Sequence, residues 1–173
     1  DIGGGGRYRG KTIDDLYVTA EIKFIDGDGG ILGQAGPTAV WTANELTAAG
    51  IMEFDTADAL NYFDQDLWDD IVMHELMHVV GFGTLWEFGS RDLVDGAFYV
   101  GPAGKSAYGG DIPIEQDGGP GTAGGHWDED TLNNELMTGY INESNFLAQF
   151  SVMSLEDLGY AVDYQDYQDT LVA

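Results

Sequence analysis

The stretch that decides the fold runs from residue 72 to residue 83 and reads Val72-Met73-His74-Glu75-Leu76-Met77-His78-Val79-Val80-Gly81-Phe82-Gly83. It contains the pattern H-E-x-x-H, with a glycine three residues after the second histidine. Residues four apart lie one above the other on a helix, so His74 and His78 can present two imidazoles to one metal ion. Glu75 lies at the edge of that face, where it can hold a water molecule. This arrangement is typical of zinc peptidases.

The residues around the motif decide whether the pattern is more than a chance match. The preceding residues are helical in pattern, and we expect a helix from about Asp66 to Val80. Asp64 and Asp66 are candidates to cap it and to oppose its positive end. Gly81 and Gly83 are expected to end it. This helix would be apolar on most of its circumference, which is typical of a central, buried helix. Such a helix can hold metal ligands rigidly.

The chain holds only three histidines, and the third is a candidate ligand. A catalytic zinc site commonly takes three protein ligands and leaves a fourth position open. His126 follows Gly124 and Gly125, which permit a close backbone approach. A lone histidine is more often an ordinary surface or core residue, but beside an H-E-x-x-H motif we favour His126 as the third ligand.

Composition excludes several classes of function. The 173 residues suit one domain, and no apolar run approaches the roughly 18 residues of a membrane helix. The 31 acidic and 6 basic residues give a net charge of −25, which argues against nucleic acid and anionic membranes as partners. An acidic, well-solvated shell explains this charge, and bound calcium is a second explanation. Without cysteine, the chain has no disulfides.

The remaining sequence predicts strands before the helix and a loop-rich part after it. Residues 13–25 are expected to form a half-buried strand, because residues 18–24 alternate apolar and polar side chains. We expect an irregular loop over 31–37, a short strand over 38–41, and another over 51–55. The strand over 51–55 is either a sheet edge that lines the cleft, where a peptide could pair with it, or an ordinary edge strand. Residues 83–125, rich in glycine, are expected to form a long, mostly irregular insertion that returns His126 to the metal.

Three further stretches carry smaller expectations. Asp26-Gly27-Asp28-Gly29-Gly30 is either a calcium loop or a tight turn, and we favour the turn. Met137, before a turn, can form an apolar floor beneath the metal, although alone it reads as ordinary core. Ser151 to Leu158 is expected to form a helix with Ser151 as its N-cap and Gly159 at its end.

Taken together, the segment from His74 to Gly83 resembles the metzincin clan of zinc peptidases. Most metzincins place the third histidine three residues after the glycine, and here that position is Thr84. His78 and His126 are 126 − 78 = 48 positions apart in the sequence, and such a separation resembles the leishmanolysin-like branch, which has an insertion between the glycine and the third histidine. Further stretches that resemble secreted bacterial members of this branch are His126-Trp127, Glu135-Leu136-Met137-Thr138-Gly139, Gly33-Gln34-Ala35-Gly36-Pro37 and Leu155-Glu156-Asp157-Leu158-Gly159-Tyr160.

The resemblance implies an α+β, metzincin-like zincin fold over 1–173. An N-terminal subdomain, about 13–83, would carry a twisted sheet and the active-site helix. A loop-rich C-terminal subdomain, 84–173, would carry the insertion, the third histidine, the Met-turn and a terminal helix. The resemblance also implies an extracellular location, although no signal peptide is visible in this sequence.

The implied function is zinc-dependent endopeptidase activity on protein or peptide substrates. His74, His78 and His126 would hold one zinc ion, and Glu75 would act as general base toward a zinc-activated water. Met137 would support the site, and Tyr140 is a candidate oxyanion stabiliser because a tyrosine near the Met-turn has this role in some metzincins. We expect a monomer. The alternative is a catalytically inactive zinc- or calcium-binding adhesion or structural domain.

Overall fold

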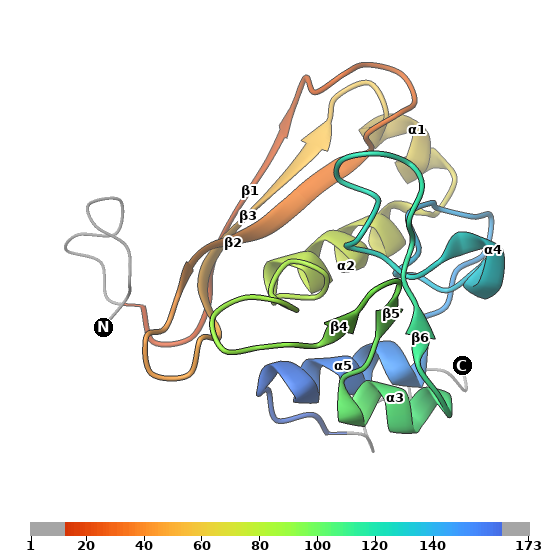
Figure 1. Cartoon of the computed structure of the whole chain (residues 1–173). Coiled ribbons are helices and arrows are strands. Elements are labelled where there is room, and N and C mark those ends of the chain that lie inside the picture. Colours follow the sequence, from red (N-terminus) through yellow and green to blue (C-terminus); the bar gives the residue numbers. More distant parts are fainter. Residues whose placement is uncertain (1–12, 164–173) are drawn as a thin grey trace.

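The structure is a computed structural model that describes residues 13–163 and shows an α+β arrangement (Figure 1). Residues 1–12 and 164–173 lie outside the described part of the chain. In chain order the elements are β1 (Tyr17–Lys23), β2 (Gly33–Val40), β3 (Thr47–Asp55), α1 (Ala59–Asp64), α2 (Trp68–Val79), β4 (Val94–Asp95), β5 (Phe98–Tyr99), α3 (Pro102–Tyr108), β6 (Ile112–Pro113), α4 (Glu129–Leu132) and α5 (Gln149–Leu158). Within 13–163, no helix is long and apolar enough to cross a membrane.

The N-terminal sheet has the strand order β1-β3-β2, with β1 parallel and β2 antiparallel to β3. The expectation that residues 51–55 form a sheet edge is therefore wrong, because they belong to the central strand. The expected loop over 31–37 is instead mostly the edge strand β2. Its small residues give no alternating apolar signal, and Pro37, which lacks an amide hydrogen, is tolerated at an edge. β2 and the central strand β3 both lie beside α2 (Figure 1).

Strand β1 was expected from its alternation, and the structure confirms the strand but not the buried face. The side chains of Ile22 and Phe24 are 57% and 72% exposed. The strand occupies the other edge of the sheet, away from α2 (Figure 1). Alternation thus indicated the backbone conformation, whereas burial depends on whether another element covers that face.

Helix α2 lies against the sheet on one side and the C-terminal part of the chain on the other (Figure 1). Met52 and Phe54 of β3 pack with Ile71 and Val79 of α2 in one buried cluster. Gly50 makes this approach possible, because a Cβ there would lie 2.6 Å from a methyl group of Val79. The helix is therefore packed against the sheet at both of its ends.

The start of α2 differs from the expected capped start. Leu67 occupies the N-cap position, and no side chain caps the helix. Asp64 ends α1 and Asp66 adopts a positive φ of 58°. Asp69 and Asp70 lie in the first turn instead, where their charges oppose the positive end of the helix dipole.

A second, aromatic core organises the chain after α2. Phe82, Trp86, Tyr99 and Trp127 are buried, and the ring centroids of Trp86 and Trp127 lie 5.1 Å apart in a stacked pair. The 83–125 segment thus contains short elements, as expected, but it is anchored by its own core. Because Trp127 is part of that core, the position of the neighbouring His126 is fixed as well.

Helix α5 begins two residues earlier than expected, at Gln149, and ends at Gly159, which adopts a left-handed conformation with a φ of 105°. Its N-cap is Ala148, so the assignment of Ser151 as N-cap is wrong. Ser151 is fully buried, and its hydroxyl donates 2.6 Å to a carboxylate oxygen of Glu135. The sequence shows a good capping residue but not the buried carboxylate that takes its hydroxyl.

The Asp26–Gly30 segment forms a bend held by carboxylates. Asp55 is buried, and one of its oxygens accepts hydrogen bonds from the backbone amides of Ile25, Asp26 and Gly27, while the other accepts from Ala57. These bonds, that from Ala57 foremost, lower the pKa of Asp55 to about 2. The Asp26 side chain likewise accepts the backbone amide of Ile31 at 3.2 Å, which agrees with the turn interpretation, and no group of side chains close enough to share a metal ion is found here among the described residues.

Candidate metal centre

The two helical histidines point toward one place from the same face of α2. The Nδ1 atom of His74 lies 2.8 Å from the carbonyl oxygen of Leu136, and that of His78 lies 3.0 Å from the carbonyl oxygen of Phe82. A carbonyl oxygen only accepts hydrogen bonds, so each Nδ1 carries the proton. Each Nε2 is then left with a free lone pair, and the ring cannot rotate without losing its bond.

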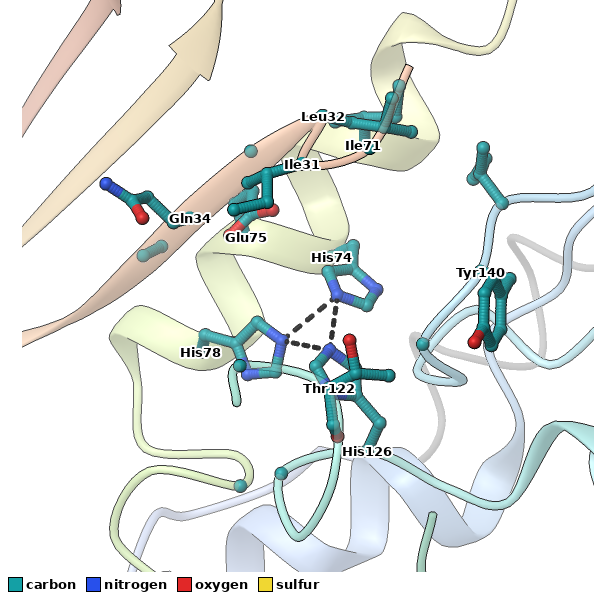
Figure 2. Close-up of a pocket in the computed structure, with 18 of the residues that line it drawn as sticks. Ile31, Leu32, Gln34, Ile71, His74, Glu75, His78, Thr122, His126 and Tyr140 are labelled. Atoms are coloured by element: carbon teal, nitrogen blue, oxygen red, sulfur yellow. Dashed lines mark hydrogen bonds between the residues drawn. The ribbon is translucent and has the colours of Figure 1, made fainter. Parts of the chain in front are cut away.

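His126 completes the group, as expected. Its Nδ1 donates to the carbonyl oxygen of Thr122 at 2.9 Å. The three Nε2 atoms form a nearly regular triangle, with edges of 3.0 Å from His78 to each neighbour and 3.1 Å between His74 and His126 (Figure 2). In residues 13–163 these are the one group of three or more His, Asp or Glu side chains close enough to share a metal ion.

The triangle has the chemistry of a metal site. With all three Nδ1 atoms protonated, three lone pairs face one another with no proton between neutral rings, which is repulsive unless a cation lies among them. Burial lowers the pKa of His74 to about 3 and lowers that of His78 and of His126, so the rings are neutral ligands at pH 7. Zn–N bonds of about 2.0–2.1 Å in a tetrahedron would separate the nitrogens by roughly 3.3 Å, close to the observed edges.

Glu75 lies beside the histidines and is 5% exposed. One carboxylate oxygen, Oε2, is buried and has no hydrogen-bond partner among the described residues. Burial raises the pKa of Glu75 to about 8. In its ionised form, an oxygen of this kind can hold a water molecule and accept a proton from it, and a cation bound by the neighbouring histidines would lower the pKa of Glu75 and favour that form.

Glycines let three segments meet at the site. A Cβ on Gly33 of β2 would lie 2.6 Å from Oε1 of Glu75, so the absence of a side chain leaves room for the carboxylate. Gly83, which has a φ of 69°, touches the backbone of Gly125 so closely that any Cβ would collide with it. The end of α2 and the segment of His126 are thereby brought together, as expected from the glycines before His126.

The site opens into a cavity of about 530 Å³. Its walls combine the histidines and Glu75 with edge strand β2 on one side and residues 120–126 and 139–141 on the other (Figure 2). Apolar side chains also line it, namely Ile31, Leu32, Ile71, Tyr62 and Ile141. The three histidines and edge strand β2 therefore border the same cavity.

The other residues singled out from the sequence occupy different positions. Tyr140 lines the cavity and is 52% exposed. Met137 is fully buried, and its carbonyl accepts the backbone amide of Trp127 at 2.9 Å. Thr84, at the position of the usual metzincin histidine, donates its hydroxyl to the carbonyl of His78 at 2.9 Å. Thr84 thus stabilises the C-terminal end of α2 and does not belong to the histidine group.

Helix α2, the edge strand and the histidine triangle define a class of protein: an α+β protein with three clustered histidines that could hold a metal ion and an adjoining carboxylate. Comparisons with known proteins indicate which family of this class the chain resembles. The leishmanolysin family matches residues 110–171. A leishmanolysin homolog of Crithidia fasciculata is 28% identical over 166 residues, covering 84% of this chain but only 24% of the relative. These matches support a leishmanolysin-like family, in agreement with the motifs, and the family points to a metallopeptidase.

Proposed function

We propose that this chain is a catalytic domain of a zinc-dependent endopeptidase that cleaves protein substrates. The observation that carries the proposal is the triangle of unprotonated Nε2 atoms beside the unpartnered oxygen of Glu75. We further propose that residues 1–173 belong to a single metzincin-like catalytic domain. The family likeness supports an extracellular or surface-associated location, and we propose that the domain acts as a monomer.

The chain's own residues supply most of the proposed mechanism. When bound by His74, His78 and His126, zinc supplies a Lewis acid that polarises the scissile carbonyl and acidifies a water molecule. Glu75 holds that water through its free oxygen, takes its proton, and passes the proton to the leaving amine. Tyr140 is proposed to donate its hydroxyl to the oxyanion, because it lines the same cavity.

The edge of β2 is proposed to hold the substrate in extended form. An edge strand offers unpaired amides and carbonyls with which a peptide can pair, and Gly33, Gln34 and Ala35 of this strand line the cavity. Glu75 argues against an inactive metal-binding domain, because a purely structural site has no use for a buried carboxylate without a partner. Met137 is proposed to form the floor of the site.

The first experiment is cleavage of casein by the purified chain, with and without a zinc chelator, together with metal analysis by mass spectrometry. We expect one zinc per chain and cleavage that stops with the chelator and returns when zinc is added. Zinc at one per chain without cleavage of casein or of a random peptide library would favour the inactive-domain alternative. Absence of zinc after incubation with the metal would overturn the proposal.

Substituting Gly33 by alanine is expected to damage the site without removing the metal. The new methyl group would lie 2.6 Å from Oε1 of Glu75 and displace the proposed base. A misplacement of this size lowers kcat/KM by about 10- to 100-fold. Gly36→Ala is the matched control, because a Cβ there meets only a methyl group of Thr84 at an ordinary 3.8 Å. Equal kcat/KM for the two variants, with equal zinc content, would show that Glu75 does not need this space.

A further inference from the structure

A buried carboxylate lies behind the metal site without touching any of the three histidines. Glu135 is fully buried in the turn that contains Met137. Its Oε2 accepts the backbone amide of Met137 at 2.6 Å, and its Oε1 accepts the amide of Ala148 at 2.8 Å and the hydroxyl of Ser151 at 2.6 Å. All three partners are donors, so the arrangement suits the ionised, acceptor-only form of a carboxylate.

The bond between Glu135 and the Met137 amide is connected to His74 through the residue between them. Glu135 and Met137 flank Leu136, whose carbonyl oxygen accepts the Nδ1 proton of His74. The bond from the Met137 amide to the Glu135 side chain closes this turn, together with the backbone bond from Thr138 to the carbonyl of Glu135 at 3.2 Å. The direction of the Leu136 carbonyl, and with it the rotation of the His74 ring, depends on this closed turn.

The bond between Glu135 and the Ser151 hydroxyl is connected to His126 through Trp127. The hydroxyl of Ser151 accepts a hydrogen bond from Nε1 of Trp127 at 2.8 Å while it donates to Glu135. Trp127 follows His126 directly, and its backbone amide donates to the carbonyl of Met137 at 2.9 Å. The residue after the third ligand is thus held at two points, and both points lead back to Glu135.

The carboxylate also replaces a missing helix cap. Helix α5 has Ala148 at its N-cap and no side chain of its own there, and Glu135 brings an anion to the positive end of this helix. The helix, the turn and the His126 segment are thereby tied to one side chain. A glutamine at this position would bring an NH₂ group against donors, and an apolar residue would leave three donors without an acceptor.

We propose that Glu135 is a positioning residue that holds His74 and His126 in the geometry required for metal binding. It does so through the Leu136 carbonyl for His74 and through Ser151 and Trp127 for His126. This inference rests on the proposed function, because it requires that the three histidines bind a metal. Glu135 would then have a role in metal binding in addition to its structural roles of capping α5 and closing the turn.

The test compares Glu135→Gln with Asp157→Asn in the full chain. Asp157 lies on α5 and has the same kind of partners, accepting the amides of Ala103 and Gly104 and the hydroxyl of Tyr99 at 2.8–2.9 Å. Its partners are not in the segments that carry the histidines or their carbonyl partners. Zinc affinity is measured by competition with a chromophoric chelator, cobalt(II) absorption reports ligand geometry, and urea unfolding of the metal-free protein reports stability.

We expect Glu135→Gln to lower zinc affinity by about 10- to 100-fold, the range found when a group that orients a metal ligand is lost, and to change the cobalt spectrum. Asp157→Asn is expected to lower the urea midpoint while leaving zinc affinity within about twofold. Unchanged zinc affinity in Glu135→Gln, or equal losses in both variants in proportion to stability, would overturn the inference.

A milder variant keeps the inference testable if Glu135→Gln does not fold. Ser151→Ala removes only the link between Glu135 and Trp127 and leaves the turn bonded, so we expect a smaller loss of zinc affinity in the same direction. If Glu135→Gln does not fold and Ser151→Ala binds zinc as the parent does, the inference is wrong. Failure of the proposed function is distinct, because there the parent itself would bind no zinc.

Discussion

Substituting Glu75 by glutamine is expected to lower kcat/KM for a protein substrate by about two to four orders of magnitude, the usual contribution of a general base. Glutamine has the same shape as glutamate but cannot take a proton. The histidine triangle does not involve the Glu75 side chain, so the variant should bind one zinc per chain with unchanged affinity. The measurement is kcat/KM on a fluorogenic peptide, with zinc content determined on the same preparation.

The surroundings of Glu75 make this variant a clean test. Its Oε2 has no partner within residues 13–163, so an amide leaves no donor of the protein unpaired at that atom. Removing a buried group with a pKa raised to about 8 also relieves a desolvation cost, and the metal-free variant should be no less stable than the parent. If the glutamine variant cleaved peptide as fast as the parent, Glu75 would not be the base, although the cleavage itself would exclude the inactive-domain alternative.

How far the site could be predicted from sequence depends on whether side chains or backbone atoms form it. The spacing of His74 and His78 predicts a shared helix face, and the scarcity of histidine singles out His126. The carbonyls of Phe82, Leu136 and Thr122 that orient the rings leave no mark in the sequence, because every residue carries the same carbonyl. They follow only from where the turns place the backbone.

Besides the backbone carbonyls, the sequence did not distinguish buried carboxylates from solvent-exposed ones. Glu135 lies after two asparagines in a chain with 31 acidic residues, so nothing in its neighbours separates it from a solvated one. Its burial follows from three donors that come from Met137, Ala148 and Ser151. A serine inside the predicted helix suggested a cap instead, because local capping is the commoner use of such a residue.

The strands show the same limit in another form. Alternation in β1 predicts a strand correctly but not its exposed apolar side chains. β2 carries no alternation at all, since glycine, alanine and proline give it no apolar face. Its place between β3 and the cavity comes from pairing partners far along the chain, and these small residues are what allow Glu75 to lie against it.

Substituting His126 by alanine is expected to weaken zinc binding by well over 100-fold and to abolish peptidase activity. Losing a ligand costs more than the roughly 10- to 100-fold caused by losing a group that orients one. The variant keeps only the two imidazoles of α2, whose Nε2 atoms lie 3.0 Å apart. Zinc affinity by chelator competition, with activity measured at saturating zinc, checks both parts.

The metal-free fold should tolerate this change, which makes the loss of zinc interpretable. His126 contributes one hydrogen bond to Thr122, worth about 0.5–1.5 kcal/mol, whereas the neighbouring Trp127 stays buried against Phe82 and Trp86. A ligand that binds only the folded state raises its melting temperature. Added zinc should therefore raise the melting temperature of the parent but not that of the His126→Ala variant.

Tyr140→Phe serves as the matched control for His126→Ala, because Tyr140 lines the same cavity without belonging to the triangle. We expect it to keep both zinc affinity and the zinc-dependent rise in melting temperature, whatever its effect on kcat. Parent-like zinc affinity in His126→Ala would mean that another group is the third ligand. The chain between His78 and His126 packs on the aromatic core of Phe82, Trp86, Tyr99 and Trp127, and such a result would mean that this core does not serve to bring a metal ligand to α2.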